Sequence, residues 1–375
     1  MLLPCRRPLF VAALIQIVNA IAKPVTSDIA NRTTVLGGRA RPLKDLRLSV
    51  IDQCNFRCTY SMPREEFGAN YRFLRASERL SFEQMVKLSR AFVTLGVKKI
   101  RITGGEPLLR PGLESLIERL AGLTTLNGKP LDIALTTNGS LLGARARALR
   151  EAGVSSVTVS LDAIDDAVFR RMSDTDLPVA RILDGIERAQ GVGLAPVKVK
   201  AVIERGANDN QILPLVRHFK GSDIAVRFIE FMDVGGASAW SKSTVLCARE
   251  MRAVVESEFP LVALCAGADS TSVNYRHADG EGEVGFIASV SEPFCGECSR
   301  ARVSADGQLF TCLFATSGAS LKPWLDDTIA DKQLVEVIQS RWNARDDQYS
   351  ELNLDRRRSG GGKNYPTVRM SLVGG

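Results

Sequence analysis

The chain has 375 residues, of which 45% are hydrophobic and 24% are charged, and this ordinary globular composition excludes a disordered chain, a collagen and a coiled coil. Lysine and arginine outnumber aspartate and glutamate by 49 to 42. That surplus suits an anionic ligand, but it does not indicate nucleic-acid binding, because no basic run with interleaved aromatic residues accompanies it.

The first residues resemble a weak signal peptide or an organelle transit peptide. Residues 1–27 contain basic but no acidic residues, and their apolar stretch is interrupted by Gln16 and Asn19, so it is unsuited to span a membrane. The alternative is a disordered extension. We expect residues 1–36 to be a leader or disordered extension. We also expect a cytoplasmic protein without a membrane partner, because closely spaced cysteines in a chain of this size do not resemble a secreted disulfide framework. A transit or signal-like role for residues 1–27 stays an alternative.

From residue 46, short apolar or β-branched runs alternate with amphipathic stretches, which predicts parallel βα units. The predicted strands are 46–51, 99–103, 132–136, 156–161, 197–203 and 224–230. The predicted helices are 81–95, 113–123, 140–152, 165–171, 179–191 and 211–219, and Ser81 with Gln84 fits a capping box at the first of them. The fold class is therefore α/β, either a partial or full barrel or a doubly wound sheet.

In a barrel the active site lies at the carboxyl ends of the strands. Unusual residues do follow the predicted strands: Cys54 and Cys58, Gly104–Pro107, Thr137–Gly139, Asp162 and Phe231–Asp233.

The sequence becomes rich in glycine and turns after about residue 265. We place a barrel domain over residues 37–265 and a smaller C-terminal α+β domain over residues 266–375, with short strands near 285–290 and 301–304. A basic, glycine-rich loop at 356–362 precedes a tail that ends in Gly374 and Gly375.

The first cysteine group is Cys54 and Cys58, followed by Tyr60 and Ser61. Closely spaced thiolates in a loop after a strand suit an iron–sulfur cluster, because soft sulfur donors match iron. The loop resembles that of the radical S-adenosylmethionine (SAM) enzymes, whose signature has three cysteines with an aromatic residue before the third. Ser61 stands at the third position.

The second group is Cys295, Cys298 and Cys312. These residues could hold another iron–sulfur cluster with one open iron. A zinc site is the alternative, although zinc usually takes four ligands and the chain has only two histidines. The remaining cysteines, Cys5, Cys247 and Cys265, lack partner spacing and are read as ordinary buried thiols.

Together these motifs resemble the GTP 3′,8-cyclase family, which begins molybdenum cofactor (molybdopterin) biosynthesis, over residues 37–375. The resemblance rests on residues 46–63, 99–110, 135–141, 157–163, 196–202, 227–234, 294–302, 309–315 and 374–375. It implies an incomplete (β/α)6-type, TIM-like barrel. A C-terminal domain that carries a second cluster near GTP would close this barrel.

The resemblance also implies site residues. Those for SAM are Tyr60, Gly105, Ser160 and Met232, and those for GTP are Arg47, Arg101, Thr136, Lys198, Arg300, Ala301 and Arg302. Glu106 would help bind the SAM amino group, and Gly374 and Gly375 would enter the site. The alternatives are core packing for Met232 and Ser160, a frayed tail, and Thr137 in place of Thr136. The resemblance gives no role to Lys200, which lies close to Lys198.

The implied cofactors are two [4Fe-4S] clusters and SAM. A 5′-deoxyadenosyl radical would remove the ribose 3′ hydrogen of GTP, and the resulting carbon radical would attack guanine C8. The product is (8S)-3′,8-cyclo-7,8-dihydroguanosine 5′-triphosphate. The implied partners are GTP, an electron donor such as a flavodoxin-like protein, and transiently the enzyme that makes cyclic pyranopterin monophosphate. A homodimer is left open.

Ser61 departs from the family pattern, because a hydroxyl is a harder and less acidic donor than a thiol. We expect the C-terminal cluster and GTP binding to survive while SAM cleavage is weak or absent. Three explanations of Ser61 compete. The chain is a degenerate paralogue, a single cysteine codon has been altered, or serine ligates a cluster with lower affinity. The alternative function is a cyclase-like GTP-binding protein with impaired SAM cleavage. A different radical SAM enzyme and a zinc-stabilised binding protein are further alternatives.

Overall fold

A computed structural model of the chain describes residues 36, 41–234, 240–265, 271–292, 298–345 and 368–374. Residues 32–375 make up one compact unit. The predicted leader, apart from Leu36, and the basic loop at 356–362 lie outside the described residues.

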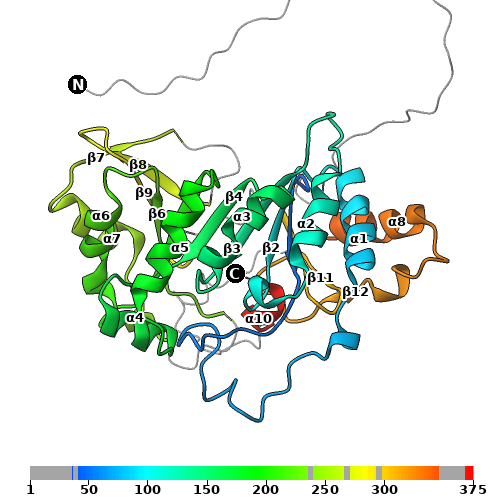
Figure 1. Cartoon of the computed structure of the whole chain (residues 1–375), viewed down its shortest axis with the longest axis horizontal. Helices are drawn as coiled ribbons and strands as arrows, with labels where there is room; N and C mark the ends of the chain where they lie inside the picture. The colour runs from blue at the N-terminus through cyan, green and yellow to red at the C-terminus, as the bar shows by residue number, and fades with distance from the viewer. Residues whose placement is uncertain are drawn as a thin grey trace, which may run out of the picture. The chain divides into compact units, whose positions relative to one another are not determined.

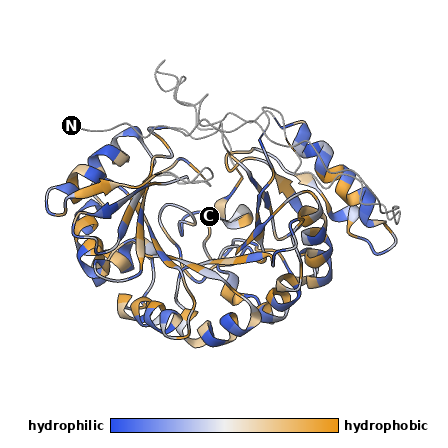
Figure 2. Cartoon of the chain, turned by 90° about the horizontal axis from the view of Figure 1, so that it is seen from above, coloured by the Kyte–Doolittle hydropathy of each residue, from blue (hydrophilic) through white to orange (hydrophobic). Residues whose placement is uncertain are grey.

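The described strands form a 12-stranded sheet in the order β12-β11-β10-β1-β2-β3-β4-β5-β6-β9-β8-β7. All neighbouring strands from β10 to β9 are parallel, and the strands beyond them at each edge are antiparallel. The sheet curves into an open, incomplete barrel, as expected (Figures 1 and 2). The bounds are β1 Asp45–Ser49, β2 Lys99–Thr103, β3 Asp132–Thr137, β4 Ser156–Ser160, β5 Val197–Ile203, β6 Ala225–Glu230, β7 Leu261–Ala263, β8 Val273–His277, β9 Glu283–Ile287, β10 Arg300–Val303, β11 Gln308–Phe310 and β12 Ala319–Ser320.

Helices cover the outer, convex face of the sheet (Figure 2). The capping box predicted at the first helix is present, because the Gln84 amide donates to Ser81 Oγ at 3.2 Å and the Ser81 amide donates to Gln84 Oε1 at 2.9 Å. The helices are α1 Phe82–Thr94, α2 Leu113–Ala121, α3 Leu142–Ala152, α4 Asp166–Ser173, α5 Val179–Gly191, α6 Ile212–Phe219, α7 Ala248–Glu256, α8 Asp331–Asn343 and α10 Met370–Val373.

The strands alternate between apolar and polar residues. In β2, Ile100 and Ile102 are fully buried beneath the helices, whereas Arg101 lies on the inner face with Thr103. The same period of two recurs in β5, where Lys198 and Lys200 alternate with buried valine and alanine residues. Because side chains two apart in a strand share a face, β2 and β5 place polar side chains on the inside of the barrel. The fold therefore leaves room for a polar ligand inside the barrel.

The strands after residue 265 extend the barrel sheet. β9 pairs in parallel with β6, and β10 pairs in parallel with β1. Trp342 on α8 is 1% exposed, and its indole N–H donates to the carbonyl of Arg41 at 3.1 Å. The start of the described range at Arg41 is thus packed against α8, and the domain boundary near residue 265 stays a prediction.

Within the described ranges, no helix combines the length and the apolar character needed to cross a membrane.

We predict that Trp342→Ala lowers the free energy of unfolding by about 3–5 kcal/mol, because it removes a buried indole and a hydrogen bond between distant segments. Urea unfolding followed by circular dichroism measures this change. Trp324→Ala is the control, because Trp324 is only partly buried and its loss should cost less. Equal losses in the two variants would contradict the prediction.

Candidate functional site

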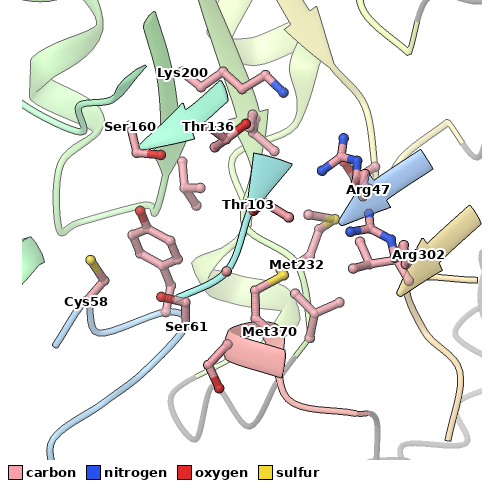
Figure 3. A pocket seen from close by; sticks show the side chains of 18 of the residues that line it. Arg47, Cys58, Ser61, Thr103, Thr136, Ser160, Lys200, Met232, Arg302 and Met370 are labelled. Carbon is pink, nitrogen blue, oxygen red and sulfur yellow. The ribbon is translucent and has the colours of Figure 1, made fainter. Parts of the chain in front are cut away.

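The inside of the barrel contains a cavity of about 260 Å³ (Figure 3). It is lined by most of the residues that the sequence assigned to the site: Arg47, Cys54, Cys58, Tyr60, Ser61, Gly105, Thr136, Ser160, Met232, Cys298, Arg300, Arg302 and Cys312. Five other assigned residues are not on its wall: Arg101, Glu106, Lys198, Ala301 and Gly374. Cys295 and Gly375 lie outside the described residues. The two cysteine groups therefore face one cavity, as far as they are described.

The glycine pair after β2 holds the first cysteine loop through its backbone. The amide of Gly105 donates to the carbonyl of Ile51, and that of Glu106 donates to the carbonyl of Gln53, each at 2.8 Å. A Cβ on Gly105 would lie 2.3 Å from the Gln53 carbonyl oxygen. Glycine is thus required here because another backbone segment fills the space of a side chain.

Glu106 is fully buried, and its carboxylate accepts three hydrogen bonds from the protein. The donors are the amide of Leu108 at 3.0 Å, the hydroxyl of Thr137 at 2.8 Å and the amide of Asn138 at 2.7 Å. Burial raises the pKa of this carboxyl to about 7, although these donors favour the charged form. In this structure the Glu106 side chain serves the neighbouring loop, and a contact with the SAM amino group stays a prediction.

Two residues that the sequence did not assign to the site organise the cysteine loop. The Asn138 amide nitrogen lies 3.7 Å from Cys54 Sγ and donates to Asn55 Oδ1 at 2.9 Å. Tyr60 donates to Asp162 Oδ2 at 2.8 Å. Asn138 and Asp162 follow the predicted strands 132–136 and 156–161. This position at the carboxyl end of a strand is the sequence feature that could have assigned them to the site.

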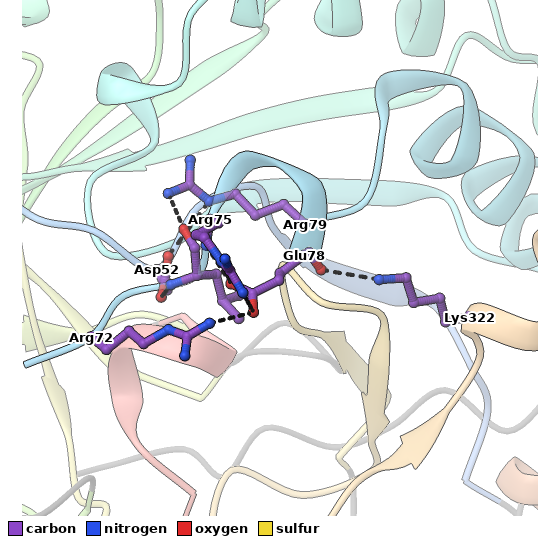
Figure 4. Close-up of polar contacts among 7 residues, drawn as sticks. Asp52, Arg72, Arg75, Glu78, Arg79 and Lys322 are labelled. Carbon is purple, nitrogen blue, oxygen red and sulfur yellow. Dashed lines mark hydrogen bonds and ion pairs between the residues drawn. The ribbon is translucent and has the colours of Figure 1, made fainter.

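A buried ion pair fixes the start of the same loop (Figure 4). Asp52 Oδ1 lies 3.7 Å from Arg79 Nε, and their side chains are 4% and 9% exposed. Asp52 also accepts from the amide of Leu74 at 2.7 Å, and Arg79 donates to the carbonyl of Leu74 at 2.6 Å. These bonds fasten the segment before α1 to the end of β1. Glu78, which pairs with Arg72, lies on the exposed side of this segment.

The described cysteines differ in acidity. Burial raises the pKa of Cys54 to about 11 and that of Cys58 well above its ordinary value. Burial also opposes ionisation of Cys298, but Arg300 and Arg345 outweigh it and lower the pKa of this thiol to about 6. The second cysteine group therefore lies in a cationic environment and the first does not.

The donor sets fit iron–sulfur clusters unequally. The first loop offers two thiols and the Ser61 hydroxyl, which is a poor iron ligand. The second group offers Cys298 and Cys312, with Cys295 outside the described residues. Across the described ranges, no group of three or more His, Cys, Asp or Glu side chains could hold a metal ion. The first loop has one thiol fewer than the three of the family signature. In the second group, all three assigned positions are cysteines in the sequence.

Cationic side chains gather on the inner face of neighbouring strands. Arg47 pairs in register with Arg101 and with Arg302. Burial lowers the pKa of Arg47 well below its ordinary value, and Arg302, Arg300 and Arg101 lower it further. Burial, followed by Arg300, lowers the pKa of Arg302 to about 10. These arginines repel one another, and a polyanionic ligand in the cavity would interact favourably with all of them.

Thr136 and Thr137 have different environments. Thr136 Oγ1 accepts from Arg101 at 3.2 Å, and Arg101 also donates to Thr158 Oγ1 at 3.1 Å. Thr137 donates to Glu106. Both threonines line the cavity, but only Thr136 contacts the cationic group.

The C-terminal tail enters the barrel. α10 lies beside Ser61 and Met232, with Met370 pointing into the cavity (Figure 3). Arg302 donates to the carbonyl of Gly374, which is buried with a φ of 70°. A Cβ on Gly374 would lie 2.1 Å from Thr103 Cγ2. Only glycine fits at this position without a shift of the chain, because a Cβ would collide with Thr103.

Two family models match the chain. Residues 48–219 match the Radical SAM superfamily, and residues 224–351 match Molybdenum Cofactor Synthesis C.

Curated relatives share a large part of the sequence. GTP 3′,8-cyclase of Xanthomonas axonopodis pv. citri (strain 306) is 48% identical, over 89% of this chain and 97% of that protein. The GTP 3′,8-cyclases of Acidothermus cellulolyticus and Staphylococcus saprophyticus are 47% and 42% identical, over 83% and 89% of this chain and 86% and 97% of theirs.

Among solved structures, Streptococcus suis SuiB bound to S-adenosylmethionine matches with a TM-score of 0.54 at 16% identity, over 80% of this chain and 68% of that one. This likeness concerns the fold.

We predict that Gly374→Ala releases the tail, because an alanine at this φ is strained and its Cβ would collide with Thr103. Hydrogen exchange of residues 368–374 should rise roughly tenfold or more, as expected for about 1–3 kcal/mol of strain. Ser371→Ala is the control, because the buried Ser371 hydroxyl has no hydrogen-bond partner. Unchanged exchange in Gly374→Ala would refute this account of the tail.

Proposed function

Because the chain belongs to the GTP 3′,8-cyclase family of radical SAM enzymes, we propose that it is a lyase that converts GTP into (8S)-3′,8-cyclo-7,8-dihydroguanosine 5′-triphosphate, at a rate that Ser61 reduces. This reaction is the first step of molybdenum cofactor biosynthesis in that family. The observation that carries the proposal is one cavity lined by cysteines of both groups and by buried arginines. A radical generator and a polyanion site would then share the same space.

The cysteines would hold two [4Fe-4S] clusters. Cys54 and Cys58, with Ser61 as a weak third donor, would hold the first, and Cys295, Cys298 and Cys312 would hold the second. When bound, the first cluster supplies the electron that cleaves SAM. Support for the second comes from Arg300 and Arg345, which favour a thiolate at Cys298.

The chain's part in the reaction is to position the two ligands. Tyr60, Gly105, Ser160 and Met232 would line the SAM site. Tyr60 is held by its hydrogen bond to Asp162, so its ring has a fixed place in the cavity.

The cationic residues would hold GTP on the opposite side. Arg47, Arg300 and Arg302 face the cavity, and Thr136 and Arg101 are hydrogen-bonded to each other. Lys198 on β5 would act from the same inner face, two strands beyond Thr136 on β3. Ala301 is fully buried on the other face of β10, so any contact it makes with GTP would come from its backbone.

The tail would exclude water from the ligands. Gly374 contacts Arg302 through its carbonyl, and Met370 and Ser371 line the cavity. Gly375 would extend further into the site.

Ser61 favours a second candidate function, a cyclase-like GTP-binding protein with impaired SAM cleavage. The first loop has two thiols where the family signature has three, while the arginine group faces the cavity intact. In this candidate GTP binding is retained and the radical step is lost.

The remaining partners are also proposed from the family. They are a flavodoxin-like electron donor, a transient encounter with the enzyme that makes cyclic pyranopterin monophosphate, and a second copy of the chain in a homodimer.

We predict that Ser61→Cys restores the first cluster. After anaerobic reconstitution, the unmodified chain should hold about four irons and the variant about eight, because a thiolate is a better iron ligand than a hydroxyl. Formation of 5′-deoxyadenosine from SAM should be weak or absent in the former and clear in the latter.

Two variants serve as controls in that experiment. Ser61→Ala should behave like the unmodified chain, and Cys312→Ala should lose the iron that remains. About eight irons and 5′-deoxyadenosine from the unmodified chain would instead show that Ser61 is tolerated, and would rule out the second candidate.

A further inference from the structure

Lys200 lines the cavity on the inner face of β5. It alternates with Val199 and Ala201, which are fully buried on the opposite face. Its side chain extends into the cavity, in the region of Thr136 and Arg47 (Figure 3). Lys198, on the same face, is not on the cavity wall. Lys200 is therefore the lysine of this strand that a bound ligand would meet.

Lys200 differs from Lys99 and Arg227, two cations on other strands that each have a carboxylate partner. Lys99 pairs with Asp132 at 2.7 Å, and Arg227 pairs with Glu283 at 3.2 Å. Within the described part of the chain, Lys200 makes no ion pair. The charges that act most on it are those of Arg47, Arg101, Arg300 and Lys198, all positive.

These surroundings disfavour the charged form of the Lys200 amine. Burial lowers the pKa of Lys200 well below its ordinary value, and the four neighbouring cations lower it further. Asp45 acts on Arg300, Arg47 and Arg101, but it is not among the charges that act most on Lys200. An anion in the cavity would remove this penalty.

We propose that Lys200 binds the triphosphate of GTP, as a further substrate-binding residue beside Arg47 and Arg300. The proposal rests on the proposed function, which supplies GTP as the ligand. A triphosphate carries several negative charges that can be shared among several cations. SAM has a carboxylate, but its sulfonium and ammonium groups make it a net cation, so a cluster of cations would repel it.

The test compares GTP with guanosine as ligands of the reconstituted full-length chain, with each affinity measured by calorimetry. Lys200→Gln should weaken GTP binding about tenfold or more, as expected for loss of a hydrogen bond from a charged group. Guanosine binding should stay unchanged, because guanosine has no phosphate. Lys200→Arg should restore most of the affinity for GTP, since it keeps the charge.

Lys332→Gln is the matched control, because the side chain of Lys332 is 85% exposed on α8. It should bind GTP like the unmodified chain. SAM is titrated into the same set of variants.

Three results would overturn the proposal while leaving the proposed function standing. They are unchanged GTP affinity in Lys200→Gln, an equal loss for GTP and guanosine, and a loss confined to SAM. Failure of the unmodified chain to bind GTP would overturn both this proposal and the proposed function, so the two failures are distinguishable.

Discussion

The structure places a cluster of cations inside the barrel, where the cations repel one another. Arg47, Arg300, Arg302 and Lys200 face one cavity, and each of the shifts in the pKa of Arg47, Arg302 and Lys200 includes repulsion by neighbouring cations. The polar inner faces of the strands make this arrangement possible, and the apolar outer faces beneath the helices stabilise it. An anion in the cavity would offset the free-energy cost of holding like charges together.

The cysteine loop depends on a different constraint, the close approach of two backbone segments. The carbonyl of Gln53 occupies the space that a side chain at position 105 would need. The Glu106 carboxylate accepts hydrogen bonds from Thr137 and Asn138 and so holds the loop after β3. Because Asn138 then reaches Cys54, three strand ends form one rigid frame around the first site. Ser61 lies in that frame and lines the cavity. This frame is therefore retained although a serine oxygen stands where the family signature has a cysteine sulfur. The retained frame favours loss of the radical step without loss of the fold.

The sequence predicted the fold well where local signals are strong. The strands at 99–103 and 197–203 and the helix at 179–191 have the expected bounds, because alternation and amphipathic spacing are properties of neighbouring residues. The parallel pairing of β9 and β10 with the barrel strands was not predicted, because it joins residues far apart in the chain.

Most of the assigned site residues line one cavity, but the distinction between Lys198 and Lys200 was out of reach of the sequence. Both share a face of one strand, and the three-dimensional position of the cavity along that strand decides which of them lines it. The environments of Thr136 and Thr137 likewise depend on contacts with other strands. The motifs predicted which residue types line the site. The contacts of each residue depend on the register between neighbouring strands, which the motifs do not determine.

The most direct test of the cation cluster is thermal unfolding of the full chain with inorganic tripolyphosphate, with guanosine as the comparison. A polyanion that binds only the folded state at about a hundred times its Kd stabilises it by about 2.7 kcal/mol. We predict that tripolyphosphate raises the Tm and that high salt abolishes the effect, while guanosine alone gives a smaller rise. An unchanged Tm with tripolyphosphate at low salt would contradict the account.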